Sequence, residues 1–429
     1  MSLFLKQRGP FFNYDHLFAC QEKQLQKLMQ RLCKQSPFYR RKLEEAAVKP
    51  EQIRTIRDLA KVPFTTKAEL RLGYPLGLQA VPDEEVVRIH SSSGTTGKPI
   101  IVPYTAGDVQ TWAEMMSRCL AMSGVTRRDR VQVTPGYGLW TAGIGFQAGV
   151  EHLGAMTIPT GPGNTEKQLE MMEDLQATVL IGTSSYGLLL AEEIHKRGLK
   201  NRLALRSGVF GSERWGDKMR GRIEELLGME TFDIYGLTEI YGPGIAIDCQ
   251  NHNGLHFWSD HLLFEIIDPV TGEQLPPGQQ GELVITTLTK EGMPLLRYRT
   301  HDITRLRTDR CTCGSPFPMI DRVLGRTDDM IKVKGVNIYP GQIDHVLKLT
   351  QGAGSEYQIV LTRLEGKDRL TIKVEAREGF EPAQLSEECR RNIKSRIGIQ
   401  CEVEAVGYGS LPRSEKKSKR VFDLREDNV

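Results

Sequence analysis

The sequence predicts an α/β protein with a large N-terminal domain, whose sheets are mostly parallel and carry a β-subdomain, and a small α+β C-terminal domain. Three observations predict this. Helical and strand patterns alternate between residues 107 and 290, which is typical of a parallel sheet covered by helices. Residues 263–303 are rich in strand patterns and turn residues, and the composition changes at Gly325. A chain of 429 residues also exceeds one typical core, so we expect at least two domains.

The elements of the N-terminal region follow from helical spacing of apolar residues. Residues 14–46 and 51–72 show this spacing, and Thr65-Thr66 with Glu69 shortly after has the pattern of a helix start. Beyond them we expect helices at 108–123, 168–176 and 218–227, and strands at 129–134, 178–181, 205–210 and 232–235. In the C-terminal domain we expect strands at 357–362 and 370–374 and a helix at 384–397.

Composition and charge limit the function classes. Hydrophobic residues make up 39% of the chain and charged residues 26%, which is ordinary for a globular protein. The net charge of +3 gives no electrostatic case for nucleic-acid or membrane binding. No apolar run approaches the length of a membrane span, and the N-terminus lacks a signal-like stretch. We therefore expect a cytoplasmic protein without nucleic-acid or membrane partners.

Residues 91–99 (Ser-Ser-Ser-Gly-Thr-Thr-Gly-Lys-Pro) are the most informative stretch. Glycines let backbone N–H groups turn inward, hydroxyls donate and lysine adds a positive charge, so the stretch suits a polyphosphate. The spacing of Gly94 and Gly97 and the proline after Lys98 exclude a Walker A loop. We expect a loop between strands at 86–89 and 100–102; the alternative is a solvated linker.

Two further motifs indicate a nucleotide site. In the motif at 233–239, Tyr235 can stack on a purine, Thr238 can donate to phosphate, and Glu239 is a hard oxygen ligand for magnesium. In the motif at 297–302, Asp302 can accept hydrogen bonds from ribose hydroxyls. The structural alternatives are a Tyr-Gly turn with a helix-capping threonine and a surface β-hairpin with a salt bridge.

The cysteines predict a structural zinc site. Cys311 and Cys313 lie one residue apart before a glycine, and Cys249 with His256 can supply two more ligands. Three thiolates and one imidazole suit tetrahedral zinc in a closed site. We favour His256 over His252 because it lies in a strand-like stretch; the alternative is two unliganded surface thiols. The other five cysteines are scattered and are expected to be structural.

Five motifs in order resemble the core motifs of the adenylate-forming superfamily, which includes acyl-CoA synthetases, luciferases and peptide-synthetase adenylation domains. They lie at 91–99, 233–239, 297–302, 325–335 and 411–420, so the resemblance covers nearly the whole chain. Four more stretches look like the phenylacetate–CoA ligase branch: 136–143, 163–168, 211–215 and 337–340.

The resemblance implies an AMP-binding and acyl-binding domain at 1–325 and a mobile lid domain at 326–429. It implies an ATP-dependent ligase that converts an aryl or arylacetic acid into an acyl-adenylate and transfers the acyl group to coenzyme A. ATP, coenzyme A and Mg²⁺ are the implied substrates and cofactor; the structural Zn²⁺ is expected from the cysteine pattern alone. Two alternatives remain: an enzyme that passes the acyl group to a carrier-protein thiol or an amine, and a non-catalytic nucleotide-binding protein with structural zinc. A homodimer is among the assemblies left open.

The resemblance also implies roles for individual residues. The catalytic residues are Thr95, Glu239 (which also holds magnesium) and Lys417. The phosphate-binding residues are Ser92, Ser93, Gly94, Thr95, Thr96, Gly97 and Lys98. The nucleotide-binding residues are Ser212, Glu213, Arg214, Asp233, Ile234, Tyr235, Gly236, Thr238, Asp302 and Arg326. The acyl pocket draws on Tyr137, Trp140, Thr141, Gly143 and Phe210; Lys334 and Gly335 meet coenzyme A; and Asp328 is the hinge.

The chain departs from the family pattern at two places. The family has Ser-Glu-Gly-Lys where this chain has Ser-Glu-Lys416-Lys417, so Lys416 is a rival for the catalytic role. His301 stands where the branch usually has glycine or arginine.

Overall fold

The computed structural model describes residues 14–92, 98–213, 215–329, 331–333, 336–364, 367–413 and 419–425. The chain forms two compact units. Unit 1 comprises residues 1–182, 202–212 and 230–322, and unit 2 comprises residues 183–201, 213–229 and 323–429. Two segments that precede residue 325 therefore group with the C-terminal part of the chain. Within the described ranges, no helix is both long and apolar enough to cross a membrane.

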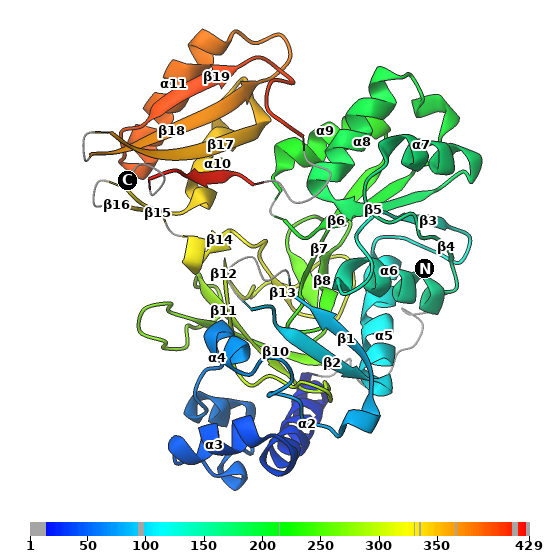
Figure 1. The fold of residues 1–429 in the computed structure, drawn as a ribbon, viewed down its shortest axis with the longest axis vertical. Helices are drawn as coiled ribbons and strands as arrows, with labels where there is room; N and C mark the ends of the chain where they lie inside the picture. The colour runs from blue at the N-terminus through cyan, green and yellow to red at the C-terminus, as the bar shows by residue number, and fades with distance from the viewer. Residues whose placement is uncertain are drawn as a thin grey trace. The chain divides into compact units, whose positions relative to one another are not determined.

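An eight-stranded mixed sheet forms the centre of unit 1, in the order β13-β9-β8-β7-β6-β5-β3-β4 (Figure 1). Its strands are β3 (Arg130–Val133), β4 (Met156–Ile158), β5 (Val179–Thr183), β6 (Ser207–Gly211), β7 (Glu230–Leu237), β8 (Gly242–Asp248), β9 (Leu255–Phe257) and β13 (Met319–Ile320). Strand β3 pairs in parallel with β4 and β5, and β6 pairs in parallel with β7. Beyond β7 the pairing is antiparallel. The predicted α/β class is confirmed.

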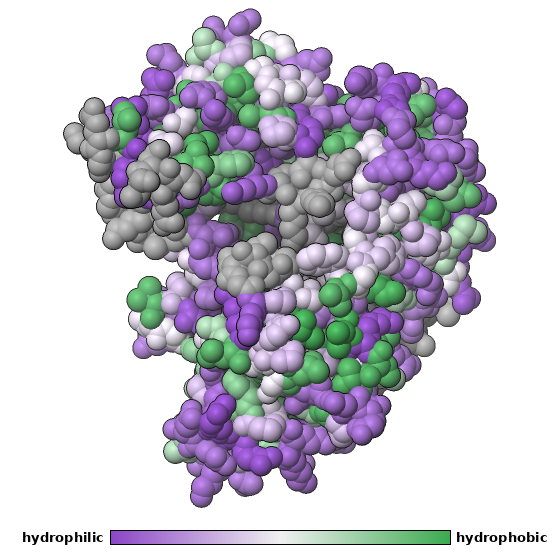
Figure 2. Space-filling view, viewed as in Figure 1, coloured by the Kyte–Doolittle hydropathy of each residue, from purple (hydrophilic) through white to green (hydrophobic). Residues whose placement is uncertain are grey.

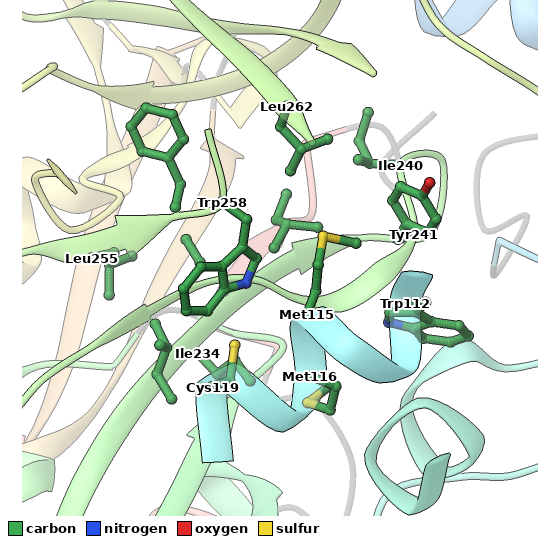
Figure 3. Close-up of a cluster of buried hydrophobic side chains, with 14 of the residues drawn as sticks. Trp112, Met115, Met116, Cys119, Ile234, Ile240, Tyr241, Leu255, Trp258 and Leu262 are labelled. Atoms are coloured by element: carbon green, nitrogen blue, oxygen red, sulfur yellow. The ribbon is translucent and has the colours of Figure 1, made fainter. Parts of the chain in front are cut away.

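The main core of unit 1 packs helix α5 against this sheet. Unit 1 contains the helices α5 (Ala106–Met122), α6 (Thr141–Leu153) and α7 (Thr165–Asp174). Figure 3 shows Trp112, Met115, Met116 and Cys119 on α5, with Trp258 in the same cluster. Each is almost fully buried. Burial of such side chains contributes about 1.5–3 kcal/mol each, so this cluster holds the sheet and helix together.

The N-terminal helices cover a second core in unit 1. They are α2 (Tyr14–Gln35), α3 (Pro37–Glu45), η2 (Pro50–Gln52) and η3 (Ile56–Lys61); α4 (Lys67–Leu72) follows them, and its buried Leu70 belongs to the main core. Apolar residues of α2 pack with Leu263, Leu288 and Leu296 from the later part of the unit. The predicted helix start is confirmed: the Thr66 hydroxyl accepts from the Glu69 N–H, and the Glu69 carboxylate accepts from the Thr66 N–H.

The predicted β-subdomain is also present. It contains the antiparallel strands β10 (Leu262–Ile267), β11 (Gly281–Thr287) and β12 (Tyr298–Thr304). A separate antiparallel hairpin pairs β1 (Val86–Ser91), which follows η4 (Asp83–Glu85), with β2 (Ile101–Thr105). The strands predicted on both sides of the Ser/Gly-rich stretch are therefore confirmed.

Unit 2 contains a four-stranded sheet in the order β19-β18-β17-β20. Its elements are α8 (Ser184–Lys196), η5 (Lys200–Arg202, whose last residue belongs to unit 1), α9 (Asp217–Leu227), β14 (Gly325–Arg326), η6 (Thr327–Asp329), β15 (Ile331–Val333), β16 (Val336–Ile338), α10 (Pro340–Leu349), β17 (Ala353–Leu364), β18 (Lys367–Ala376), α11 (Pro382–Ile397), β19 (Glu402–Val406) and β20 (Val421–Asp423). A separate apolar core lies between the sheet, α10 and α11.

Charged and polar residues dominate the visible surface. Figure 2 shows one face on which hydrophilic residues cover most of the periphery, with hydrophobic residues in small groups between them. This distribution agrees with the charged content of 26%.

Candidate active site

Two predicted nucleotide-site residues lie at the same edge of the unit 1 sheet. Strands β6 and β7 are parallel, so their C-terminal ends share one edge. Ser212 follows β6 directly and Tyr235 lies near the end of β7. In open α/β sheets, ligands bind at the carboxyl ends of parallel strands. A nucleotide is therefore expected to bind at this edge.

The structure joins Tyr235 and Asp302, which the sequence placed in different motifs. The Tyr235 hydroxyl donates to Oδ2 of Asp302 over 2.5 Å. Asp302 is buried and Tyr235 is half-buried. A carboxylate has about four lone-pair positions, so the same group can accept from Tyr235 and from other donors, such as the hydroxyls of a ribose.

A bulge in β12 sets the position of Asp302. Residues Glu282 and Val284 of β11 pair with Ile303 and Arg299 of β12, so three residues of β12 oppose one of β11. His301, within this bulge, has φ of +66°, a conformation that favours glycine. His301 therefore holds a strained backbone conformation at this bulge.

Tyr235→Phe is expected to raise the KM for ATP about fivefold to tenfold, with a smaller change in kcat. The ring remains, and only the hydroxyl that fixes Asp302 is lost, which costs about 1 kcal/mol. Initial rates at varied ATP concentration measure this effect. An unchanged KM for ATP would contradict the assignment of Asp302 to the ribose.

Glu239 is a buried carboxylate with a lysine beside it. It is 6% exposed, and its Oε1 lies 3.5 Å from Nζ of Lys67, the first residue of α4. An ion pair offsets the cost of burying a charge. Lys67 was not predicted, because nothing in the local pattern around it indicates a distant carboxylate.

Lys290 is a second lysine that the sequence analysis did not predict, and it lies in the sequence between the 233–239 and 297–302 motifs. Nζ of Lys290 is 3.7 Å from the ring centre of Tyr104 on β2 and 4.1 Å from that of Tyr241. The side chain is fully buried, and burial lowers its pKa to about 8. Among the described residues its ammonium finds no hydrogen-bond partner, so the two aromatic faces are its main stabilising contacts.

The other residues of the 233–239 motif have structural contacts of their own. Ile234 is buried in the core, and the N–H of Asp233 donates to Asp248 Oδ1 over 2.8 Å. Gly236 is required by the β7–β8 pairing, because a Cβ there would collide with the Gly242 carbonyl. Thr238 is half-buried. Their nucleotide-binding roles stay predictions.

Three residues predicted to bind the nucleotide have local contacts or an unusual backbone. Ser212 is exposed, with φ of +69°. Oε1 of Glu213 accepts from the N–H and hydroxyl of Ser185, at 2.7 and 2.5 Å, at the start of α8. Nε and Nη2 of Arg326 donate to the two carboxylate oxygens of Asp328, at 2.8 and 2.9 Å. The predicted hinge residue is therefore paired with the arginine that precedes it.

The hairpin β1–β2 frames the predicted phosphate loop. The Ile100 N–H donates to the Ser92 hydroxyl over 2.9 Å, and Nζ of Lys98 lies 5.1 Å from the ring centre of Tyr74. Several predicted site residues lie outside the described residues: Ser93, Gly94, Thr95, Thr96, Gly97, Arg214, Lys334, Gly335, Lys416 and Lys417. Their roles stay predictions.

The residues predicted for the acyl pocket differ in exposure. Trp140 is 48% exposed, so it is not a core residue, whereas Phe210 on β6 is fully buried. Tyr137 is half-buried, its hydroxyl has no partner among the described residues, and burial raises its pKa to about 12. Thr141 begins α6, and a Cβ on Gly143 would lie 2.7 Å from the Tyr137 ring. The pocket stays a prediction.

The four predicted metal ligands converge in unit 1. The ligand atoms of Cys249, His256, Cys311 and Cys313 all lie within 4.8 Å of one another. Sγ of Cys249 is 3.5 Å from Sγ of Cys311, and Sγ of Cys313 is 3.3 Å from Nε2 of His256. In a zinc site with Zn–S bonds of about 2.3 Å, sulfurs lie roughly 3.8 Å apart.

The imidazole of His256 is oriented toward the thiols. It lies on β9, and its Nδ1 is 2.8 Å from the Phe317 carbonyl, to which a ring N–H there donates. This contact leaves Nε2 for a metal, which is the usual arrangement of a ligating histidine. His252 instead lies beside Asp248 and Glu230. All eight cysteines are free of disulfides.

Comparison with known proteins defines the class. The sequence pattern of the AMP-binding enzymes matches residues 17–289, and that of the AMP-binding enzyme C-terminal domain matches residues 335–425. The chain therefore belongs to the AMP-binding, adenylate-forming enzymes.

Within this family the chain groups with the phenylacetate–CoA ligase branch. It is 43% identical over 433 residues to the phenylacetate-coenzyme A ligase of Thermus thermophilus, with 96% of this chain and 97% of that protein covered. The branch predicted from the motifs is confirmed.

A solved relative shares the fold. 2-Hydroxyisobutyryl-CoA ligase, in a postadenylation state with 2-HIB-AMP, is 29% identical and has a TM-score of 0.86 over 95% of this chain and 89% of that chain. The same ligase in its thioesterification state, with 2-HIB-AMP and CoA, has a TM-score of 0.71 over 96% of this chain and 91% of that chain.

Proposed function

We propose that this protein is an ATP-dependent, AMP-forming ligase that joins an aryl or arylacetic acid, phenylacetate first among them, to coenzyme A. One observation carries the proposal: the Tyr235–Asp302 pair and the buried Glu239 lie at and just beyond the end of β7, where a nucleotide would bind. The identity of 43% to a phenylacetate-coenzyme A ligase over nearly the whole chain supports the choice of acid.

The reaction has two steps. A carboxylate oxygen of the acid attacks the α-phosphorus of ATP, the bond to the bridging oxygen of pyrophosphate breaks, and an acyl-adenylate forms. The thiolate of coenzyme A then attacks the acyl carbon, and AMP leaves with the bonding electrons. Both reactants of the first step are anions, so cationic groups must lower its barrier.

Each of the proposed site residues binds a different part of the reactants. Tyr235 covers the adenine face, and Asp302 accepts from the ribose. Thr95, Thr96 and Lys98 hold the β- and γ-phosphates, and Lys417 bridges the carboxylate and the α-phosphate. Lys334 and Gly335 line the path of the thiol after the C-terminal part turns about Asp328.

Glu239 fits a magnesium ion by the chemistry of its donor. It offers hard carboxylate oxygens in a buried setting, and the neighbouring Lys67 balances its charge when no divalent cation is bound. Bound Mg²⁺ would neutralise charge on the phosphate oxygens.

Release of AMP in the presence of a panel of carboxylic acids tests the proposal. We expect release that depends on the acid and on coenzyme A, fastest with phenylacetate or a close relative. Acid-dependent pyrophosphate exchange without any stimulation by coenzyme A would favour transfer to a carrier thiol or an amine. No exchange with any acid would favour a binding protein.

We further propose that Cys249, His256, Cys311 and Cys313 hold one structural zinc ion. The convergence of three thiols and one oriented imidazole supports this site, which has no open ligand position. Metal analysis of protein purified without chelator is expected to find about one equivalent of zinc. Less than half an equivalent would contradict the proposal.

A further inference from the structure

Unit 2 contains residues from both of the segments that match family patterns. Residues 183–201 and 213–229 belong to the segment matched as AMP-binding enzyme, whereas residues 335–425 are matched as its C-terminal domain. The structure nevertheless groups them in one compact unit. The contacts of α8 and α9 with residues 335–425 therefore hold the two matched segments together within this unit.

Arg413 makes the principal contact with α8. Its Nε and Nη2 donate to both carboxylate oxygens of Glu192, at 3.0 and 3.1 Å. Its Nη1 and Nη2 also donate to Glu375 of β18, at 2.9 and 3.0 Å. The Tyr408 hydroxyl adds a donor to Glu192 Oε1 at 2.6 Å. One guanidinium thus links a helix of the AMP-binding segment to the sheet of the C-terminal part.

Lys218 makes a second contact, from α9. Its Nζ donates to the carbonyls of Leu347, Thr350 and Ala353, at 2.8, 3.0 and 2.7 Å, at the end of α10 and the start of β17. An ammonium has three donors, so all of them are used. The neighbouring Asp217 forms an ion pair with Lys348.

Arg413 directly precedes, in the sequence, the segment that carries the catalytic lysine of the proposed function. Arg413 is the last described residue before 414–418, which contains Lys417. On the other side, Arg420 donates to Glu356 Oε1 over 3.2 Å, within the C-terminal part. Of the two flanking arginines, Arg413 is the one bound to α8.

The hydrogen bonds of Arg413 to Glu375 and those to Glu192 respond differently when the C-terminal part moves. Its bond to Glu375 lies inside the C-terminal part and is kept whenever that part moves as a body. Its bond to Glu192 exists only while the C-terminal part lies against α8. The solved 2-hydroxyisobutyryl-CoA ligase occurs in a postadenylation and a thioesterification state, so in that protein the enzyme adopts more than one arrangement.

We propose that Glu192 and Lys218 are positioning residues for acyl-adenylate formation, an inference that rests on the proposed function. They hold the C-terminal part against α8 and α9 during the first step, and their contacts open before coenzyme A reacts. Charge-assisted hydrogen bonds of this kind shift a conformational equilibrium by about tenfold or more.

Glu192→Gln tests this directly, because Arg413 keeps Glu375 as a partner and the amide keeps the shape of the side chain. We expect pyrophosphate release without coenzyme A to slow about tenfold. Thioester formation from preformed phenylacetyl-adenylate and coenzyme A should be unchanged or faster. Lys218→Met, on the other helix, should show the same split between the half-reactions.

Glu193→Gln is the matched control, because Glu193 pairs with Lys196 of its own helix and with Arg197 directly after it. It should alter neither half-reaction. Equal slowing of both half-reactions in Glu192→Gln, no slowing of either, or loss of its cooperative thermal unfolding would overturn the proposal. Inactivity of the unmodified protein in both half-reactions would instead contradict the proposed function.

Discussion

Lys417→Ala is expected to slow acyl-adenylate formation about 10³-fold and to leave thioester formation from a supplied acyl-adenylate within about twofold of the unmodified protein. Removal of one preorganised donor to a developing negative charge typically costs 10²–10³ in rate. The first step brings a carboxylate to the α-phosphorus of ATP, whereas in the second step a thiolate attacks the acyl carbon of the adenylate and not its phosphate. The loss should therefore fall on one half-reaction alone.

Lys416→Ala tests which of the two adjacent lysines in the Ser-Glu-Lys-Lys stretch is the catalytic one. We expect it to change the rate of either half-reaction by less than about threefold, since the proposed function gives Lys416 no contact with the reacting groups and a charge screened by solvent acts weakly. Pyrophosphate exchange and a thioester assay with synthetic adenylate measure the two steps separately. A large loss in Lys416→Ala with a small one in Lys417→Ala would reverse the assignment.

Cys313→Ala is expected to lower the free energy of unfolding by about 4 kcal/mol and to release the proposed zinc ion. Loss of a metal is among the few mechanisms that produce effects this large. Cys313 is only half-buried, so removal of its thiol alone costs little packing. Denaturant unfolding together with metal analysis measures both quantities.

Cys20→Ala is the matched control, because Cys20 is also half-buried and lies on α2, outside the metal cluster. Its unfolding free energy should change by less than about 1 kcal/mol, with zinc retained. A loss of stability in Cys313→Ala without a loss of zinc would show that the thiol acts through packing alone.

Local patterns were sufficient to predict elements whose apolar residues recur at regular spacing. Helices α5, α7 and α9 and strands β3, β5, β6 and β7 lie within a few residues of the predicted ranges. Helix α6 was missed because it contains Gly143, Gly145 and Gly149, which disfavour a helix in isolation. A Cβ at Gly145 or Gly149 would collide with Trp112 or Met116, so these glycines let α5 and α6 approach closely.

Helix α8 was missed for a different reason. Its first turn is capped by Glu213, which lies far along the chain and whose carboxylate also accepts from Ser184 over 3.1 Å. The local sequence also contains a capping residue, because the Thr183 hydroxyl accepts from the Tyr186 N–H, but that signal was not used. Helix α10 carried a local signal as well, because Pro340 stands at its first position, and that signal was not used either.

The candidate site was predictable where one short motif supplies the chemistry. Tyr235, Glu239, Asp302 and the four proposed metal ligands were named from residue type and spacing. Their partners were not. Lys67, Lys290 and the Glu192–Arg413 pair depend on tertiary contacts between distant segments, which no local pattern records.

The most direct test of the central claim is a rapid-quench experiment with enzyme in excess of ATP, with phenylacetate present and coenzyme A added second. We expect phenylacetyl-adenylate and pyrophosphate to form before coenzyme A is added, and AMP and phenylacetyl-CoA to appear only afterwards, with the adenylate consumed. Formation of ADP and phosphate, or of thioester with no adenylate on the way, would contradict the account.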